Sequence, residues 1–231
     1  TYFYRFNVTR PPFDNPKIRR AFSLAVDKEA VVEKITRGGE PIALSLTPRG
    51  VPGYRAPEGP VASPVTAKAL LREAGYPNGE GFPRVSILYN KSELNEQIAV
   101  ELQAQWKNNL GVHVDLRNQE WATYLRSLDA LDFDIARSSW VGDYDDPLTF
   151  LDCFATGRGN NRTGWSDPAY DNLLAKAQAE PNATTRLRLL EQAEEILVAQ
   201  AMPIIPLYHF VGCLMFDPKK WDGLLPNLLD E

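Results

Sequence analysis

Residues 85–140 decide the fold: VSILYNKSELNEQIAVELQAQWKNNLGVHVDLRNQEWATYLRSLDALDFDIARSSW. Short runs rich in β-branched and aromatic residues alternate in this stretch with longer patterns of helical periodicity. We expect strands at 85–90, 112–119 and 133–140, and helices at 95–111 and 121–130. Strands that alternate with helices predict an α/β protein whose mixed or largely parallel sheet is covered by helices.

The flanking sequence extends this pattern in both directions. Asp14 or Asn15 is placed to cap a helix that has Pro16 in its first turn, and Gly38 and Gly39 are expected to end the next helix. Residues 40–64 are rich in proline and glycine and predict a long irregular loop. Further helices are expected at 65–76, 146–157, 166–180 and 184–200, and further strands at 1–8 and 204–212.

Composition excludes several classes of protein. The chain has 231 residues, is 44% hydrophobic and has a formal net charge of -5. Its lysines and arginines are scattered, so nucleic acid is not expected as a partner. The longest apolar stretch, 202–216, contains two prolines and is too short for a membrane helix.

Cysteine and histidine do not form a metal-binding pattern. Cys153 and Cys213 lack the spacing of a zinc site, and His113 and His209 lie in apolar, strand-like runs. No cofactor is expected. The two cysteines form either one disulfide or two separate buried thiols, because the sequence does not give their distance.

An acidic cluster follows directly after the expected strand 133–140. Three carboxylates occur within four residues, at Asp143, Asp145 and Asp146. Like charges this close repel one another, so water, a cation or a ligand must relieve the repulsion. Ligands of α/β sheets gather at the carboxyl ends of strands, so the cluster lies where a binding site is expected.

Five motifs in order resemble one protein family. They are TYFYRFNVTRPPFDNPKIRRAFSLAVDKEAVVEKITRGGEP, LGVHVDLRNQEW, FDIARSSWVGDYDDPLTFLDCF, GNNRTGWSDPAYDNLL and MPIIPLYHF, and together they cover nearly the whole chain. They resemble the larger, C-terminal lobe of the oligopeptide-binding proteins, the extracytoplasmic receptors of peptide ABC importers in solute-binding protein family 5.

The resemblance implies a fold, an organisation and a location. It implies that residues 1–231 form a single lobe of the type II periplasmic binding protein fold, with the N-terminal lobe and the C-terminal return segment of the receptor outside this chain. Its partners would be an oligopeptide, that missing lobe and the membrane permease subunits of an ABC transporter. The receptor would be periplasmic, or anchored outside the cell in a Gram-positive organism.

The resemblance also implies site residues. Asp143, in the W-x-x-D-Y motif, would hold the free α-ammonium of the peptide through a charge-assisted hydrogen bond. Ser139, Trp140 and Val141 would pair with the extended peptide, and Trp140 and Trp121 would wall its side-chain pockets. For each tryptophan, core packing is the alternative; for Asp143, capping of the next helix.

Two further positions matter to the other end of the peptide. Arg137 would serve either a ligand carboxylate or, within the protein, Asp143 or Glu120. Asn95 stands where oligopeptide binders can carry a histidine for the peptide C-terminus. An amide brings no charge, so preferred peptide length stays open.

Other roles for the acids compete with this one. Asp145 and Asp146 precede Pro147 and are expected to cap the following helix, although a calcium site with Asp143 is an alternative. A remote alternative is a hydrolase in which Asp143 and Glu120 form the carboxylate pair. We expect that the chain is not an enzyme. The same fold could instead bind a dipeptide, a murein peptide, a sugar or a metal chelate.

Overall fold

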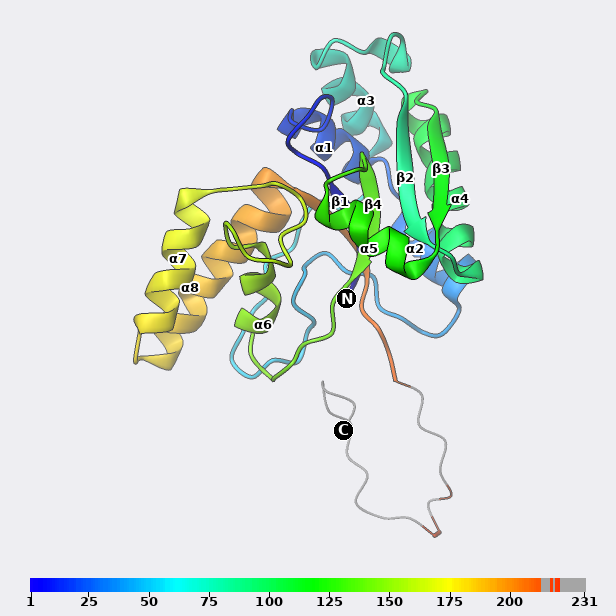
Figure 1. Cartoon of the computed structure of the whole chain (residues 1–231). Coiled ribbons are helices and arrows are strands. Elements are labelled where there is room, and N and C mark those ends of the chain that lie inside the picture. Colours follow the sequence, from blue (N-terminus) through cyan, green and yellow to red (C-terminus); the bar gives the residue numbers. More distant parts are fainter. Residues whose placement is uncertain (213–216, 218, 221–231) are drawn as a thin grey trace.

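The computed structural model describes residues 1–212, 217 and 219–220, and its centre is one mixed sheet (Figure 1). The strands are β1 (Tyr2–Phe6), β2 (Val85–Asn90), β3 (Val114–Gln119), β4 (Ile135–Ser139) and β5 (Ile204–Tyr208), in the order β3-β2-β4-β1-β5. Strand β2 is parallel to β3 and β4, whereas β1 is antiparallel to β4 and β5. The predicted α/β class and mixed sheet are confirmed.

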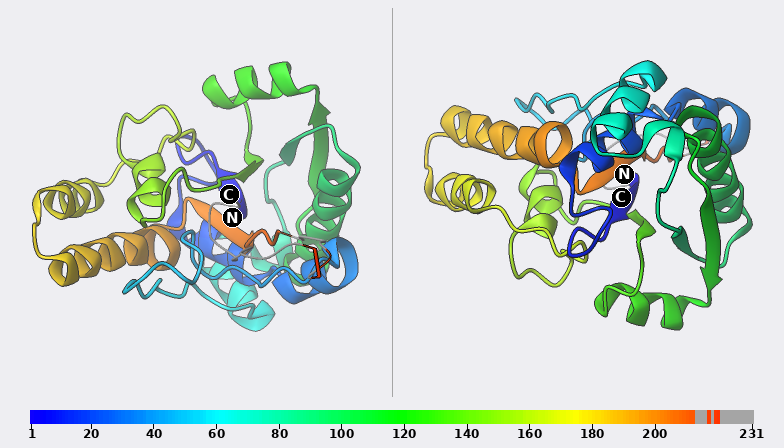
Figure 2. Two further views of the ribbon diagram at one scale, coloured as in Figure 1. Left: turned by 90° about the horizontal axis from the view of Figure 1, so that it is seen from below. Right: turned by 90° about the horizontal axis from the view of Figure 1, so that it is seen from above.

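Helices cover both faces of this sheet (Figure 2). On one face lie α1 (Pro16–Leu24), α3 (Pro64–Glu73) and α4 (Glu93–Leu110), packed in one core with β1 and β2. On the other lie α5 (Trp121–Asp129), α6 (Leu148–Leu151), α7 (Pro168–Ala179) and α8 (Ala183–Glu195). Alternation along β1 places Tyr2 and Tyr4 in the first core and Phe3 in the second, so Arg5 points to the second face as well.

Several helix ends follow the expected signals. Asn15 is the N-cap of α1, and its side chain accepts a hydrogen bond from the Lys17 amide at 2.9 Å. Gly111 ends α4 with φ at +74°. A Cβ there would lie 2.1 Å from the carbonyl oxygen of Asn78, so only glycine fits.

Other boundaries differ from the sequence prediction. The second helix is α2 (Lys28–Val31) followed by a π-helical turn, η1 (Val32–Thr36), and it ends before Gly38 because Arg37 already adopts the left-handed conformation. The helix expected at 146–157 is only α6 and a 3₁₀ turn, η3 (Asp152–Phe154). A second π-helical turn, η4 (Ile196–Ala201), extends α8, and a short 3₁₀ turn, η2 (Pro77–Gly79), precedes β2.

The proline-rich stretch after η1 is an irregular loop, as expected, and a buried carboxylate holds it. Both oxygens of Glu194 are used: one accepts the amides of Leu46 and Thr47, each at 2.7 Å, and the other accepts the Tyr54 hydroxyl. This anchor fixes the loop against α8 without regular secondary structure.

Candidate functional site

The carboxyl end of β4 leaves main-chain groups open on one side. Thr1 and Trp140 exchange two main-chain hydrogen bonds, at 2.6 and 2.9 Å, and so extend the β1–β4 ladder. Because pairing alternates along an antiparallel ladder, the main-chain groups of Ser139 and Val141 point away from β1. Strand β2 pairs with β4 at Ile135 and Ala136, and beyond these two residues no strand of the described chain covers this edge of β4.

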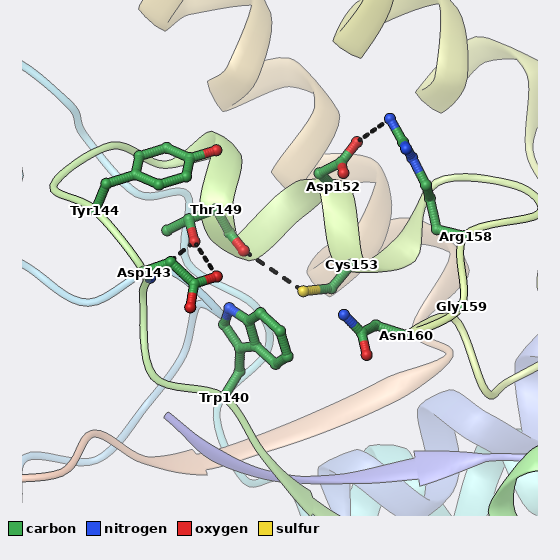
Figure 3. A pocket seen from close by; sticks show the side chains of 9 residues that line it. All are labelled: Trp140, Asp143, Tyr144, Thr149, Asp152, Cys153, Arg158, Gly159 and Asn160. Atoms are coloured by element: carbon green, nitrogen blue, oxygen red, sulfur yellow. Dashed lines mark hydrogen bonds and ion pairs between the residues drawn. The ribbon is translucent and has the colours of Figure 1, made fainter.

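A pocket of about 380 Å³ lies just past this edge (Figure 3). We call it the Asp143 pocket, and it is lined by Trp140, Asp143, Tyr144, Thr149, Asp152, Cys153, Arg158, Gly159 and Asn160. Thr149 holds Asp143 at the pocket: its hydroxyl accepts the Asp143 amide at 3.0 Å and donates to the carboxylate at 3.4 Å. Asp143 therefore has a fixed backbone while its carboxylate remains exposed.

The structure separates the acids that the sequence clusters. Asp146 forms a two-point ion pair with Arg186, at 2.6 and 2.9 Å, and also accepts the Leu148 amide at 2.9 Å. Asp152 pairs with Arg158 at 3.2 Å. Asp143 has no ion pair among the residues that the structure describes.

The pKa of Asp146 reflects this arrangement. Partial burial alone would raise it, but the hydrogen bonds from Arg186 and Leu148 and the Arg186 charge outweigh that effect and lower the pKa. Pro147 occupies the N-cap position of α6, and Asp146, one residue earlier, accepts the amide of Leu148, the first residue of the helix; Asp146 thus contacts the helix N-terminus without being its N-cap. Asp145 is exposed, and its capping role stays a prediction.

A second pocket, of about 200 Å³, adjoins the first. We call it the Arg5 pocket; its lining includes Arg5, Trp121, Tyr124, Arg137, Ser138, Ser139, Trp140, Asn160 and Arg162. Trp140, Cys153 and Asn160 border both pockets, so the two share a wall. Trp121 is 55% exposed and stacks on Tyr124 with ring centroids 5.8 Å apart.

Arg137 lies opposite Tyr4 in the ladder and so points to the face that carries Tyr2 and α4. Its guanidinium lies 4.8 Å from the centroid of the Tyr2 ring, and one terminal nitrogen donates to the side chain of Asn90 at 3.4 Å. Asn95, buried on α4, donates to Asn90 and accepts the Tyr2 hydroxyl. Asn95 is therefore part of the network that holds Arg137.

The structure thus brings most of the predicted site residues together. The Asp143 pocket is lined by Trp140 and Asp143. The Arg5 pocket is bordered by Trp121, Arg137, Ser139 and Trp140. Val141 lies between Trp140 and Asp143 in the chain and is 61% exposed. Only Asn95 is separate. Among the residues described, Arg137 forms no ion pair with Asp143 or Glu120; Glu120 instead pairs with Lys91 at 3.4 Å, and it borders neither pocket.

Sequence reasoning missed several lining residues. Thr149, Asp152 and Arg158 carry no signal beyond their closeness to Asp143 in the chain. Arg5 did carry one, because a charged residue inside the aromatic strand YFYRF is unusual. Cys153 is buried in the shared wall, and the thiol donates to the carbonyl of Thr149 at 3.4 Å; Cys213 lies outside the described residues, so a disulfide between them stays untested.

Comparison with known proteins identifies the family. Residues 1–162 match the profile of the bacterial extracellular solute-binding proteins, family 5, middle region. The chain belongs to this family. Its fold is accordingly the type II periplasmic binding protein fold, as the resemblance implied.

Curated relatives are of several kinds. The dipeptide-binding protein DppE of Bacillus subtilis is 40% identical over 220 residues, which are 90% of this chain and 40% of that protein. The oligopeptide-binding protein OppA of B. subtilis is 34% identical, over 98% of this chain and 43% of its own. The murein peptide-binding protein MppA of Escherichia coli is 37% identical, with 94% and 41% covered. The chain thus spans about two fifths of these relatives.

Solved structures agree with these matches. The murein tripeptide-binding protein MppA of E. coli superposes with a TM-score of 0.85 and 37% identity, over 91% of this chain and 42% of that one. Haemophilus influenzae OppA, in complex with the peptide RPPGFSPFR, superposes with a TM-score of 0.84 and 33% sequence identity, over 91% of this chain and 42% of that one. Within the described residues, none of the helices combines the length and the apolarity that crossing a membrane requires.

Proposed function

We propose that this chain is the larger ligand-binding lobe of a two-lobed receptor that delivers oligopeptides to an ABC importer outside the cytoplasm. A peptide lies extended along the open edge of β4, and Asp143 holds its free α-ammonium. The other lobe then closes over the bound peptide, and the transporter recognises the closed form.

The observation that carries this proposal is the charge of Asp143. Its acidic neighbours Asp146 and Asp152 each have an arginine within 3.2 Å, whereas no described cation pairs with Asp143. A ligand ammonium would supply the missing charge with three N–H donors. The repulsion within the acidic cluster is then relieved by Arg186 at Asp146, by water at Asp145 and by the ligand at Asp143.

The open edge of β4 supports the mode of binding. The main-chain groups of Ser139 and Val141 point away from β1, so an extended peptide can add there as a further strand. Main-chain pairing uses groups that every peptide has, and so it gives low sequence selectivity. Trp140 and Trp121 offer ring faces to side chains of many kinds.

The pattern of relatives supports capture rather than catalysis. The curated relatives named above bind dipeptides, oligopeptides or murein peptides, and all of these are solute-binding proteins. The carboxylate pair imagined for a hydrolase is also separated, because Glu120 lies at the start of α5 and outside the Asp143 pocket. We therefore propose that the receptor binds its ligand without turnover.

Native mass spectrometry of the full receptor, purified from its own cells, tests this proposal. We expect bound masses that fragment as peptides with unblocked amino termini. A sugar, a metal chelate or a lipid as the bound species would contradict it.

A further inference from the structure

The Arg5 pocket contains a buried cation that no acidic side chain in the described part of the chain neutralises. Arg5 is only 5% exposed, and among the described residues it takes part in no ion pair. The residues that line the pocket include no aspartate or glutamate. Removing an arginine from water without a paired anion is costly, so folded proteins rarely retain one without a reason.

The hydrogen bonds of Arg5 are incomplete. One terminal nitrogen donates to the carbonyl of Asn160 at 3.2 Å and the other donates to the Ser138 hydroxyl. Nε is buried and has no hydrogen-bond partner within the part of the chain that the structure describes. A guanidinium has five N–H donors in a planar fork, so several remain for a planar anion such as a carboxylate.

Arg162 adds a second cation at the same pocket. Its guanidinium pairs with Asp129 at 2.7 Å, but Asp129 is the more exposed partner, with 60% of its side chain accessible against 26% for Arg162. Burial lowers the pKa of Arg5 to about 10; Tyr124 raises it slightly, and the charge of Arg162 lowers it slightly further. Arg5 therefore still carries its charge at neutral pH.

We propose that the Arg5 pocket is a subsite for a carboxylate of the bound peptide, with Arg5 and Arg162 as its specificity-determining residues. This inference rests on the proposed function, because the peptide must first lie along β4. Arg137 also borders this pocket, but its guanidinium lies against the Tyr2 ring on the opposite face of the sheet, so we do not assign the subsite to it. The Asp143 pocket and the Arg5 pocket share Trp140 and Asn160, so the subsite lies close to the proposed ammonium site.

This arrangement selects a substrate class. A peptide that presents its ammonium to Asp143 would place one of its next residues over the shared wall, since each extended residue spans about 3.3–3.6 Å. The favoured peptides carry an acidic side chain there, or end there in a free carboxylate. Both sources present the same planar anion.

The test is calorimetric titration of the full receptor with matched tetrapeptides in an alanine frame. Glutamate or glutamine is placed at position two, three or four, with the C-terminus free or amidated. In the wild type we expect the glutamate peptide to bind at least about tenfold more tightly than its glutamine partner at one position. The ratio of the two affinities is the readout, because it is insensitive to the fraction of folded protein.

Variants assign the preference to its residues. Arg162→Gln and Arg5→Gln should bring the ratio toward one, whereas Arg5→Lys should keep part of it because the charge remains. Arg84→Gln is the matched control, since Arg84 directly precedes β2, has 89% of its side chain exposed and pairs with Asp115. Because Arg5 also joins β1 to β4, Arg162→Gln keeps the test valid if the Arg5 variants fail to fold.

The outcomes separate the two proposals. If tighter binding follows the glutamate side chain, the subsite takes acidic side chains. If tighter binding appears only for peptides with a free C-terminal carboxylate, the subsite takes the peptide C-terminus. A ratio near one at every position and for both kinds of C-terminus, while the peptides still bind, overturns the subsite and leaves the proposed function standing. If no peptide binds, the proposed function fails and this inference fails with it.

Discussion

Replacing Asp143 by asparagine removes one charge from the Asp143 pocket and little else. Asparagine has almost the same shape, and its carbonyl can still accept the Thr149 hydroxyl, which lies 3.4 Å from the carboxylate in the wild type. The amide of residue 143 keeps its 3.0 Å bond to Thr149. The loop should therefore keep its conformation while the proposed ammonium ligand is lost.

The magnitude follows from the nature of the contact. A hydrogen bond to a charged group contributes about 1.5–3 kcal/mol, and about 1.4 kcal/mol corresponds to a factor of ten in Kd. We therefore expect Asp143→Asn to weaken binding of free-amine peptides roughly 10- to 100-fold. Exposure of Asp143 in the separate lobe argues for the lower part of this range, and closure of the receptor over the peptide for the upper part.

The assay is calorimetric titration of the full receptor with one tripeptide. Asp145→Asn is the matched control, because Asp145 is also exposed, lies two residues from Asp143 and loses the same charge. Thermal unfolding shows whether both variants retain the fold. Equal losses of affinity in the two variants would refute the reasoning, since general attraction between the acidic cluster and a cation would then explain the binding.

Three further predictions concern the framework. In a double-mutant cycle of Asp146→Asn and Arg186→Gln, urea unfolding should give a coupling free energy of about 1–2 kcal/mol, and additive losses of stability would contradict the pairing. Because the pKa of Asp146 is lowered in the folded state, this stabilisation is present above the unfolded-state pKa and is lost as the pH falls through the folded-state pKa. Burial lowers the pKa of Lys28 to about 7, so between pH 7 and about 10.4 the unfolded chain binds one proton more than the folded protein, and the free energy of unfolding should rise with pH in this window. Lys28→Met should flatten that rise, and parallel pH profiles for the wild type and the variant would contradict this prediction. Glu194→Ala leaves the buried amides of Leu46 and Thr47 unpaired, which should cost about 3 kcal/mol and expose residues 48–60 to proteolysis, whereas unchanged cleavage would show that the loop has another anchor.

Periodicity and caps predicted the framework because those signals are local. The alternation at 85–140 gave the strands and the helices between them, and Asn15 and Gly111 are where the expected caps lie. The break after α6 was missed, since the run LTFLDCF has helical composition but η3 tightens it. Propensity alone does not register how a chain must turn to bury Phe154.

The site was only partly predictable for a different reason. The carboxyl end of β4 and its acids were found from the sequence, and the family motif distinguished Asp143 from its neighbours. The pairing of Asp146 with Arg186 joins residues forty positions apart, and no local pattern contains it. Arg5 on β1 and Arg162 in the segment between η3 and α7 likewise border one pocket although they lie far apart in the chain, and the hydrogen bond from the Val8 amide to the Thr163 carbonyl brings that segment beside the end of β1.

The central claim is that Asp143 binds the free amino terminus of a peptide. Titration of the wild-type full receptor with pairs of tri- to pentapeptides, identical except for acetylation of the amino terminus, tests it most directly. Acetylation removes the charge and all but one of the N–H donors, so we expect the free peptides to bind and their acetylated partners to bind at least about tenfold more weakly. Equal affinity for the two forms would contradict the claim, because the carboxylate of Asp143 would then have no ammonium to hold.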